Sequence, residues 1–181
     1  MRKSVLILSL SLAALAGAGL AIYFVYNYLP ASPKGQIASF EECVRLGNPV
    51  MESYPRQCRD SFGKVFVENI GNESEKTDLI KVSEPRPNQV VKSPLAVKGE
   101  ARGVWFFEAS FPIKLYDSNG KQIGLGVAQA QSDWMTENFV PFSVILKFEK
   151  PETPYGTLIL QKDNPSGLPE HEDQLVVPVS F

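Results

Sequence analysis

The chain has 181 residues, of which 44% are apolar and 21% charged, and its formal net charge is −2. This composition is typical of a globular protein and argues against a disordered chain, a collagen, a coiled coil or a basic nucleic-acid-binding protein. One His and two Cys leave few ligands for a zinc site, which usually takes four donors drawn largely from these types. We therefore expect no metal, no cofactor and no nucleic-acid partner.

The first thirty residues predict a membrane anchor. Arg2 and Lys3 precede an uncharged, mostly apolar run at residues 4–29, which as a helix would cover roughly 39 Å and cross a bilayer core of about 30 Å. A cleaved signal peptide is the alternative, because Ala16-Gly17-Ala18 offers a small-residue cleavage site. We favour a retained anchor over 1–30, because the apolar run continues well past that site and ends among tyrosines suited to the membrane interface.

The distribution of Pro, Gly and polar residues divides the rest of the chain. We predict a flexible spacer at 31–37, a small two-Cys unit at 38–68, an interdomain linker at 69–78 and a larger domain at 79–181. Because basic residues flank the anchor on its N-terminal side, we expect everything after the anchor to lie outside the cytoplasm.

Cys43 and Cys58 are expected to form a disulfide. An oxidising compartment beyond the membrane lets such bonds persist, and closing a loop of about 15 residues would stabilise the unit by roughly 3 kcal/mol. So small a unit buries too little apolar surface to fold alone. A nucleophilic or redox thiol is the competing interpretation, but it would want a His partner or a C-x-x-C spacing, and neither is nearby.

The last hundred residues show the period-two pattern of β-strands. Between residues 104 and 116 every odd position is apolar, so we expect one half-buried strand with Trp105 and Phe107 on its buried face. Asp117-Ser118-Asn119-Gly120 supplies turn chemistry, and Ile123, Leu125 and Val127 alternate again after it. A hairpin is therefore predicted at this turn.

Similar alternation elsewhere brings the number of short strands to about seven. The further strands are marked by Ile80 with Val82, by Leu95 with Val97, and by the sets 140–148, 158–160 and 175–179. With no convincing helix between them, they predict a mainly β fold, an antiparallel sandwich in which two sheets bury their apolar faces against each other.

Residues 80–181 also resemble the bacterial spore germination immunoglobulin-like domain. The marks of this resemblance are Ser93-Pro94-Leu95, Gly99, Ala101, Phe107-Glu108, Asp117, Gly120, Phe142, Gly156 and Pro178-Val179. The resemblance implies an extracytoplasmic immunoglobulin-like β-sandwich of the kind found in membrane-anchored and germination-associated proteins, without an agreed ligand or catalytic residue. A germination-related role is implied by the resemblance alone.

The two-Cys unit resembles a small motif that recurs in bacterial envelope proteins. The residues that mark this resemblance are Phe40, Gly47, Pro49, Tyr54, Pro55, Gly63 and Phe66. This resemblance covers about thirty residues and implies no known chemistry.

Two aromatic residues are candidates for a binding patch. Phe106 lies on the polar, even-numbered face of its expected strand, and Trp134 lies in a loop-like stretch. Exposed aromatic side chains anchor partners well because they bring a large area at low entropy cost. The plainer interpretation is that sandwich edges and corners bury such residues.

Three functional hypotheses follow. We favour a noncatalytic module, anchored in the membrane through residues 4–29, that binds an envelope protein or a wall polymer. An enzyme acting on wall material through Glu108, Asp133 or Glu170 is the second, and it would need two carboxylates facing each other across a groove. A structural spacer that holds another component at a set distance from the membrane is the third.

Overall fold

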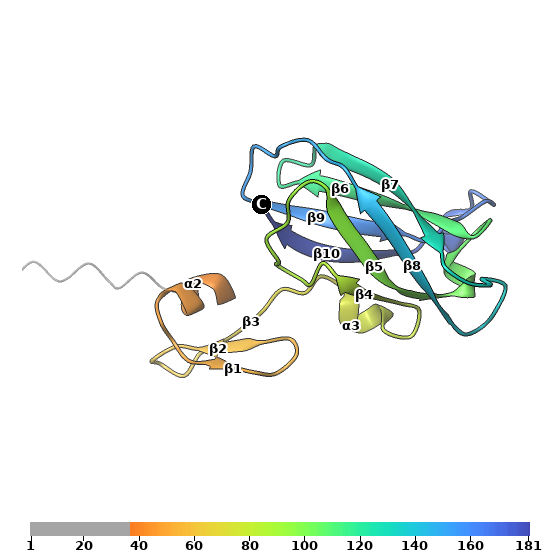
Figure 1. Cartoon of the computed structure of the whole chain (residues 1–181). Coiled ribbons are helices and arrows are strands. Elements are labelled where there is room, and N and C mark those ends of the chain that lie inside the picture. Colours follow the sequence, from red (N-terminus) through yellow and green to blue (C-terminus); the bar gives the residue numbers. More distant parts are fainter. Residues whose placement is uncertain (1–36) are drawn as a thin grey trace, which may run out of the picture.

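A computed structural model describes residues 37–181 as a small N-terminal unit beside a larger β domain (Figure 1). The predicted anchor at 1–30 and, apart from its last residue, the predicted spacer at 31–37 lie outside the described residues. Within residues 37–181, no helix is long and apolar enough to cross a membrane.

The small unit combines one helix with a three-stranded antiparallel sheet in the order β1-β2-β3. Its elements are α2 (Phe40–Arg45), β1 (Val50–Met51), β2 (Gln57–Arg59) and β3 (Val65–Val67). Ser39 begins the helix, because its side chain accepts a hydrogen bond from the backbone N–H of Glu42. The buried core contains only four residues, which are Phe40, Cys43, Cys58 and Phe66.

The larger domain has seven antiparallel strands, which confirms the predicted number and fold class. The strands are β4 (Ile80–Glu84), β5 (Leu95–Arg102), β6 (Ser110–Asp117), β7 (Gln122–Ala130), β8 (Phe139–Leu146), β9 (Tyr155–Gln161) and β10 (Gln174–Ser180). They follow one continuous order, β10-β9-β6-β7-β8-β5-β4, so the two layers of the sandwich are halves of one hydrogen-bonded sheet. The sheet folds over on itself at the β7–β8 junction, which pairs only at Gln129 with Ser143 and at Ala130 with Phe142.

The core lies between the two halves of this folded sheet. It holds twenty-one buried residues, and aromatic rings occupy its middle. The Phe111 ring packs edge-to-face against Phe142, at a centroid distance of 4.9 Å, and against Phe106, at 5.2 Å. Aromatic pairs prefer this geometry to a face-to-face stack. On β6 the expected alternation is confirmed, because Phe111, Ile113 and Leu115 are fully buried.

The start of the predicted strand at 104–116 was wrong. Residues Gly103–Trp105 form a short 3-10 helix, η1, and the chain then reverses at a two-residue turn before β6 begins. Glu108 and Ala109 have φ of 48° and 61°, the backbone conformation of such tight hairpin turns. Trp105 therefore lies in the core, whereas Phe107 is 41% exposed.

On β7 the apolar alternation of Ile123, Leu125 and Val127 marks the inward face correctly only at Ile123, which is buried. Leu125 and Val127 are exposed, and the small residues Gly124, Gly126 and Ala128 face the core. A side chain at Gly126 would lie 3.0 Å from the Leu146 side chain, so this position has little room for a larger residue. The hydrophobic pattern therefore does not identify the inward face of β7. The side chains opposite this strand already fill the space, so only small residues fit there.

Residues 69–78 join the two units, but the segment is not a free spacer. It contains α3 (Glu73–Lys76) and runs along β10, where the Asn72 amide and backbone exchange hydrogen bonds with Val176. Lys76 adds an ion pair to Asp173 at 2.6 Å. Its polar composition therefore reflects hydrogen bonding to the edge of β10, which would otherwise present unpaired backbone groups to solvent.

The 3-10 helix η2 (Pro169–His171) lies in the β9–β10 loop, at the end of the sandwich remote from the small unit (Figure 1). The C-terminus and the start of β9 lie at the other end, next to the small unit. The small unit therefore borders one end of the sandwich only.

Candidate functional site

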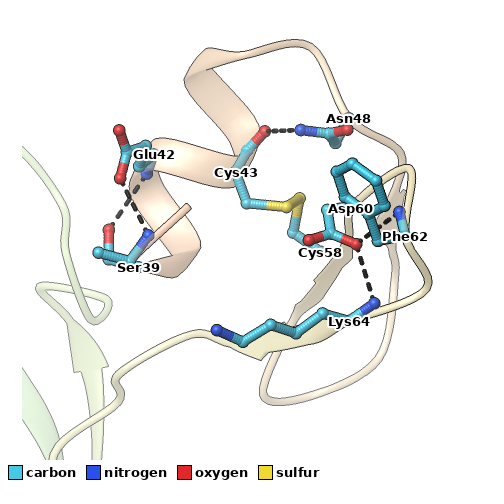
Figure 2. The surroundings of a disulfide bond; sticks show 9 residues. Ser39, Glu42, Cys43, Asn48, Cys58, Asp60, Phe62 and Lys64 are labelled. Carbon is cyan, nitrogen blue, oxygen red and sulfur yellow. Dashed lines mark hydrogen bonds between the residues drawn. A yellow bond between two sulfur atoms is a disulfide. The ribbon is translucent and has the colours of Figure 1, made fainter. Parts of the chain in front are cut away.

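The disulfide expected between Cys43 and Cys58 is present and holds α2 against β2 (Figure 2). Both cysteines are fully buried, and their Cα atoms lie 6.1 Å apart, within the usual range for a disulfide. The turn that follows is fixed by the Asp60 carboxylate, which accepts hydrogen bonds from the backbone N–H groups of Phe62 and Lys64. The bond and this turn set the shape of the unit, because its apolar core is so small.

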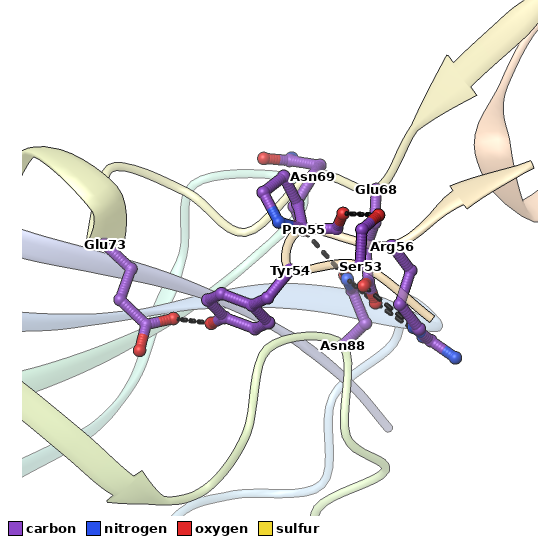
Figure 3. A network of polar contacts seen from close by, with 8 residues as sticks. All are labelled: Ser53, Tyr54, Pro55, Arg56, Glu68, Asn69, Glu73 and Asn88. Carbon is purple, nitrogen blue, oxygen red and sulfur yellow. Dashed lines mark hydrogen bonds and ion pairs between the residues drawn. The ribbon is translucent and has the colours of Figure 1, made fainter. Parts of the chain in front are cut away.

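A polar network centred on Glu68 joins the small unit to the sandwich (Figure 3). The Glu68 carboxylate accepts two hydrogen bonds from the Arg56 guanidinium, at 2.8 and 2.5 Å. The side-chain amide of Asn88, in the β4–β5 loop, donates to Glu68 at 3.2 Å and to the backbone oxygen of Asn69 at 2.8 Å. Asn88 therefore contacts both the small unit and the segment that follows it.

The charges of this network fix the protonation of Glu68. The hydrogen-bonded Arg56 guanidinium is the main cause that holds the pKa of Glu68 below its ordinary value, and Asn88 adds to the effect although burial opposes it. Glu68 is only 6% exposed, so as a carboxylate it needs these partners. A charged Glu68 thus depends on both the small unit and the sandwich side.

Tyr54 forms a second link between the units. Its hydroxyl donates a hydrogen bond to the Glu73 carboxylate on α3, and the Arg86 guanidinium lies 6.0 Å from its ring centroid. Desolvation of the hydroxyl and the hydrogen bond to Glu73 raise the pKa of Tyr54 above its ordinary value. The hydroxyl therefore keeps the proton that it donates.

An open pocket of about 680 Å³ lies where the two units meet. The small unit, the connecting segment, the β4–β5 loop, the β6–β7 turn and the β9–β10 hairpin all contribute to its lining. The lining residues are Ser39, Glu41, Asn69, Asn88, Ser118, Tyr155, Gly156, Thr157, Pro178, Val179 and Ser180. Hereafter we call this the junction pocket, and its walls exist together only while the units are docked.

A second groove of about 650 Å³ lies beside the C-terminus. Phe148 and Phe181 form part of its lining, with ring centroids 5.9 Å apart, and Lys92 and Lys150 stand at its sides together with Glu152. It belongs to the sandwich alone. We call it the terminal groove.

The expected patch of Phe106 and Trp134 does not form. Phe106 is 4% exposed and packs edge-on against Phe111 in the core, because η1 and the following turn change the parity of the segment. Trp134 is partly buried against the core, although it lies in the β7–β8 loop as expected. Neither side chain is the exposed anchor that the hypothesis required.

Sequence reasoning missed Tyr155, an exposed aromatic residue in the junction pocket. Its side chain is 57% exposed at the start of β9. The signal was present, because Leu158 and Leu160 are buried and strand alternation then turns Tyr155 and Thr157 to the outer face.

The three carboxylates considered for an enzyme lie on exposed loops. Glu108 precedes β6, Asp133 lies between β7 and β8 with its carboxylate accepting the Met135 N–H, and Glu170 is in η2. All three loops are at the end of the sandwich remote from the small unit. The junction pocket thus contains none of them.

Comparison with known families identifies the larger domain. A family model described as the immunoglobulin-like domain of bacterial spore germination matches residues 79–167. The match spans six of the seven strands, β4 to β9, and leaves out β10 and the whole two-Cys unit. No curated protein and no solved structure is significantly similar to the chain.

Proposed function

Because the larger domain of this chain belongs to the immunoglobulin-like domain family of bacterial spore germination, we propose that the protein is a noncatalytic binding module of the bacterial cell envelope. In this proposal the sandwich and the two-Cys unit act together on an envelope protein or a wall polymer. A germination-related role rests on the family resemblance alone.

The observation that carries the proposal is the junction pocket. Ligand sites are commonly concave and often lie between domains, with volumes of about 300–1,000 Å³. The junction pocket has a volume of this order, lies between the units, and is bounded by the Asn88 contacts that dock them. A spacer would need no such shared concave surface.

We also propose that residues 4–29 anchor the protein in the membrane and that both folded units lie outside the cytoplasm. The uncharged, apolar character of that run supports an anchor. The buried disulfide supports an oxidising compartment, where such bonds persist.

The anchor is tested by fractionation of cells that express the full chain. The protein should stay with the membranes through a high-salt wash, because an apolar helix in lipid is insensitive to screening of charge. Release of a form that begins near Gly19 would instead demonstrate cleavage after the small-residue site and contradict the anchor.

Binding is tested with the detergent-solubilised full chain and purified wall sacculi, alongside cross-linking in intact envelopes. We expect either co-sedimentation with the sacculi or one cross-linked protein that also binds the purified chain, with no soluble fragments released from the sacculi. Release of fragments would indicate the hydrolase. The spacer would be indicated if the chain neither sedimented with sacculi nor had a verified partner, and if an unrelated sandwich of equal size rescued a deletion strain.

A further inference from the structure

We propose that the junction pocket binds a neutral oligosaccharide. This inference rests on the proposed binding function and specifies its ligand as the uncharged sugar portion of a wall polymer. It follows from three features of the pocket, which are an exposed aromatic floor, hydroxyl and amide groups with unused hydrogen-bonding capacity, and the shortage of charge.

The floor of the pocket is the outer face of the β9–β10 hairpin. Tyr155 is paired with Ser180 and Thr157 with Pro178, so these four side chains lie together on one face of the sheet. Tyr155 is 57% exposed, and its ring provides a flat apolar surface with a polar tip. Sugar rings have an apolar C–H face and hydroxyls at their rim, so such a floor complements them.

The walls offer both donors and acceptors. Among the described residues, none hydrogen-bonds to the Tyr155 hydroxyl, the Thr157 hydroxyl, the Asn69 side-chain NH₂ or the Asn88 side-chain oxygen. Ser39 uses its oxygen to cap α2 and retains its hydroxyl proton as a donor. A ligand rich in hydroxyl groups, each both donor and acceptor, matches this mixture.

The charge of the lining separates neutral from anionic polymers. Among residues 37–181, Glu41 is the one carboxylate of the lining, and no Lys or Arg of this range lines the pocket. A phosphate-bearing or otherwise anionic polymer would meet that negative charge without a compensating cation. The terminal groove, with Lys92 and Lys150, has the opposite character. The junction pocket therefore favours an uncharged ligand.

An extended peptide is less favoured, because the edge of β10 is already occupied. Asn88 N–H donates to the Pro178 oxygen, Val91 N–H to the Ser180 oxygen, and Ser180 N–H to the Gln89 oxygen. A peptide that adds a strand to a sheet requires free backbone groups at the edge. Recognition at the junction pocket thus depends on side chains, as it does for sugars.

The inference is tested by isothermal titration calorimetry of the detergent-solubilised full chain with two neutral trisaccharides. These are the β-1,4-linked trimer of N-acetylglucosamine and maltotriose. We expect at least one to bind with a Kd below about 1 mM. Tyr155→Ala should weaken that binding at least about tenfold, since exposed tyrosines often dominate binding, and Thr157→Val should weaken it by a smaller factor. Phe62→Ala is the matched control, because this 91% exposed ring lies outside the pocket; it should leave the Kd unchanged. Polyphosphate should not compete.

Several results would overturn the inference. These are failure of both trisaccharides to bind, binding that Tyr155→Ala leaves unchanged while its circular dichroism remains that of the wild type, or competition by polyphosphate. Sedimentation with sacculi that survives Tyr155→Ala would overturn the pocket assignment and leave the proposed function intact. A cross-linked protein that protects Tyr155, without sugar binding, would likewise replace the sugar by a protein ligand at the same pocket.

Discussion

The small unit buries four residues around a disulfide, whereas the sandwich buries twenty-one residues and contains no cysteine. The sandwich can rely on apolar burial because its folded sheet encloses a continuous core. The small unit lacks that resource, so it depends on a covalent bond and on polar contacts with its neighbour. The two regions should therefore respond to different perturbations, and the contacts between them should be the most easily disturbed part of the molecule.

Truncation in the sandwich core should have the largest effect. Phe142 is 1% exposed and packs against Phe111, so Phe142→Ala leaves a cavity and should lower the free energy of unfolding by about 3–5 kcal/mol. Urea denaturation measures this directly. Phe107→Ala is the control, because Phe107 is 41% exposed, and it should cost about 0.5 kcal/mol or less. Equal costs for the two variants would contradict the assigned core.

Removal of the disulfide should affect the small unit selectively. The bond closes a loop with a sequence separation of 15, so Cys43→Ser with Cys58→Ser should cost that unit about 3 kcal/mol. Amide exchange in α2 and β1–β3 should then accelerate by about a hundredfold, while exchange in β5 and β8 stays constant. Equal acceleration in both regions would show that the unit and the sandwich unfold as one body.

A smaller effect is expected at the contact between the regions. Asn88 has φ of 61° and donates two hydrogen bonds across the junction. Glycine adopts this backbone conformation without strain, so Asn88→Gly removes the side-chain amide and measures the loss of the two hydrogen bonds alone. We expect a cost of about 1 kcal/mol to docking, seen as faster amide exchange in residues 38–68. Gln89→Ala in the same loop provides a control that keeps both junction bonds, because within the described part of the chain the Gln89 side chain bonds only to the backbone of Arg86.

The smallest effect on stability is expected from acidification, through the Glu68 carboxylate. The pKa of Glu68 is lowered in the folded protein, chiefly by Arg56, so its stabilisation is complete above the unfolded-state pKa of about 4.3 and is lost as pH falls through the lower folded-state pKa. Arg56 is half exposed, which limits the contribution to about 1 kcal/mol or less. Protection of the small unit between pH 6 and 3 should therefore fall, and Glu68→Gln should flatten part of this decrease. An increase in protection on acidification would contradict the sign.

The sequence predicted much of the sandwich, because period-two alternation and turn residues are local signals. The β6–β7 hairpin at Asp117 was predicted for the same reason, since turn chemistry suffices. The disulfide was predicted differently, from the oxidising compartment expected beyond a membrane anchor. Phe106 was misplaced because η1 and the two-residue turn at Glu108 and Ala109 interrupt the alternation locally, and the expected parity resumes on β6. The junction pocket could not be predicted, because it combines residues such as Ser39 and Tyr155 whose proximity arises only from docking.

The junction pocket exists as a shared site if the two-Cys unit and the sandwich keep one fixed relative orientation. Residual dipolar couplings of the full chain, measured for amides of residues 38–68 and 79–181, test it most directly. One alignment tensor should fit both sets. Two tensors of different magnitude or orientation would show that the units move independently, and the junction pocket would then not exist as a single site.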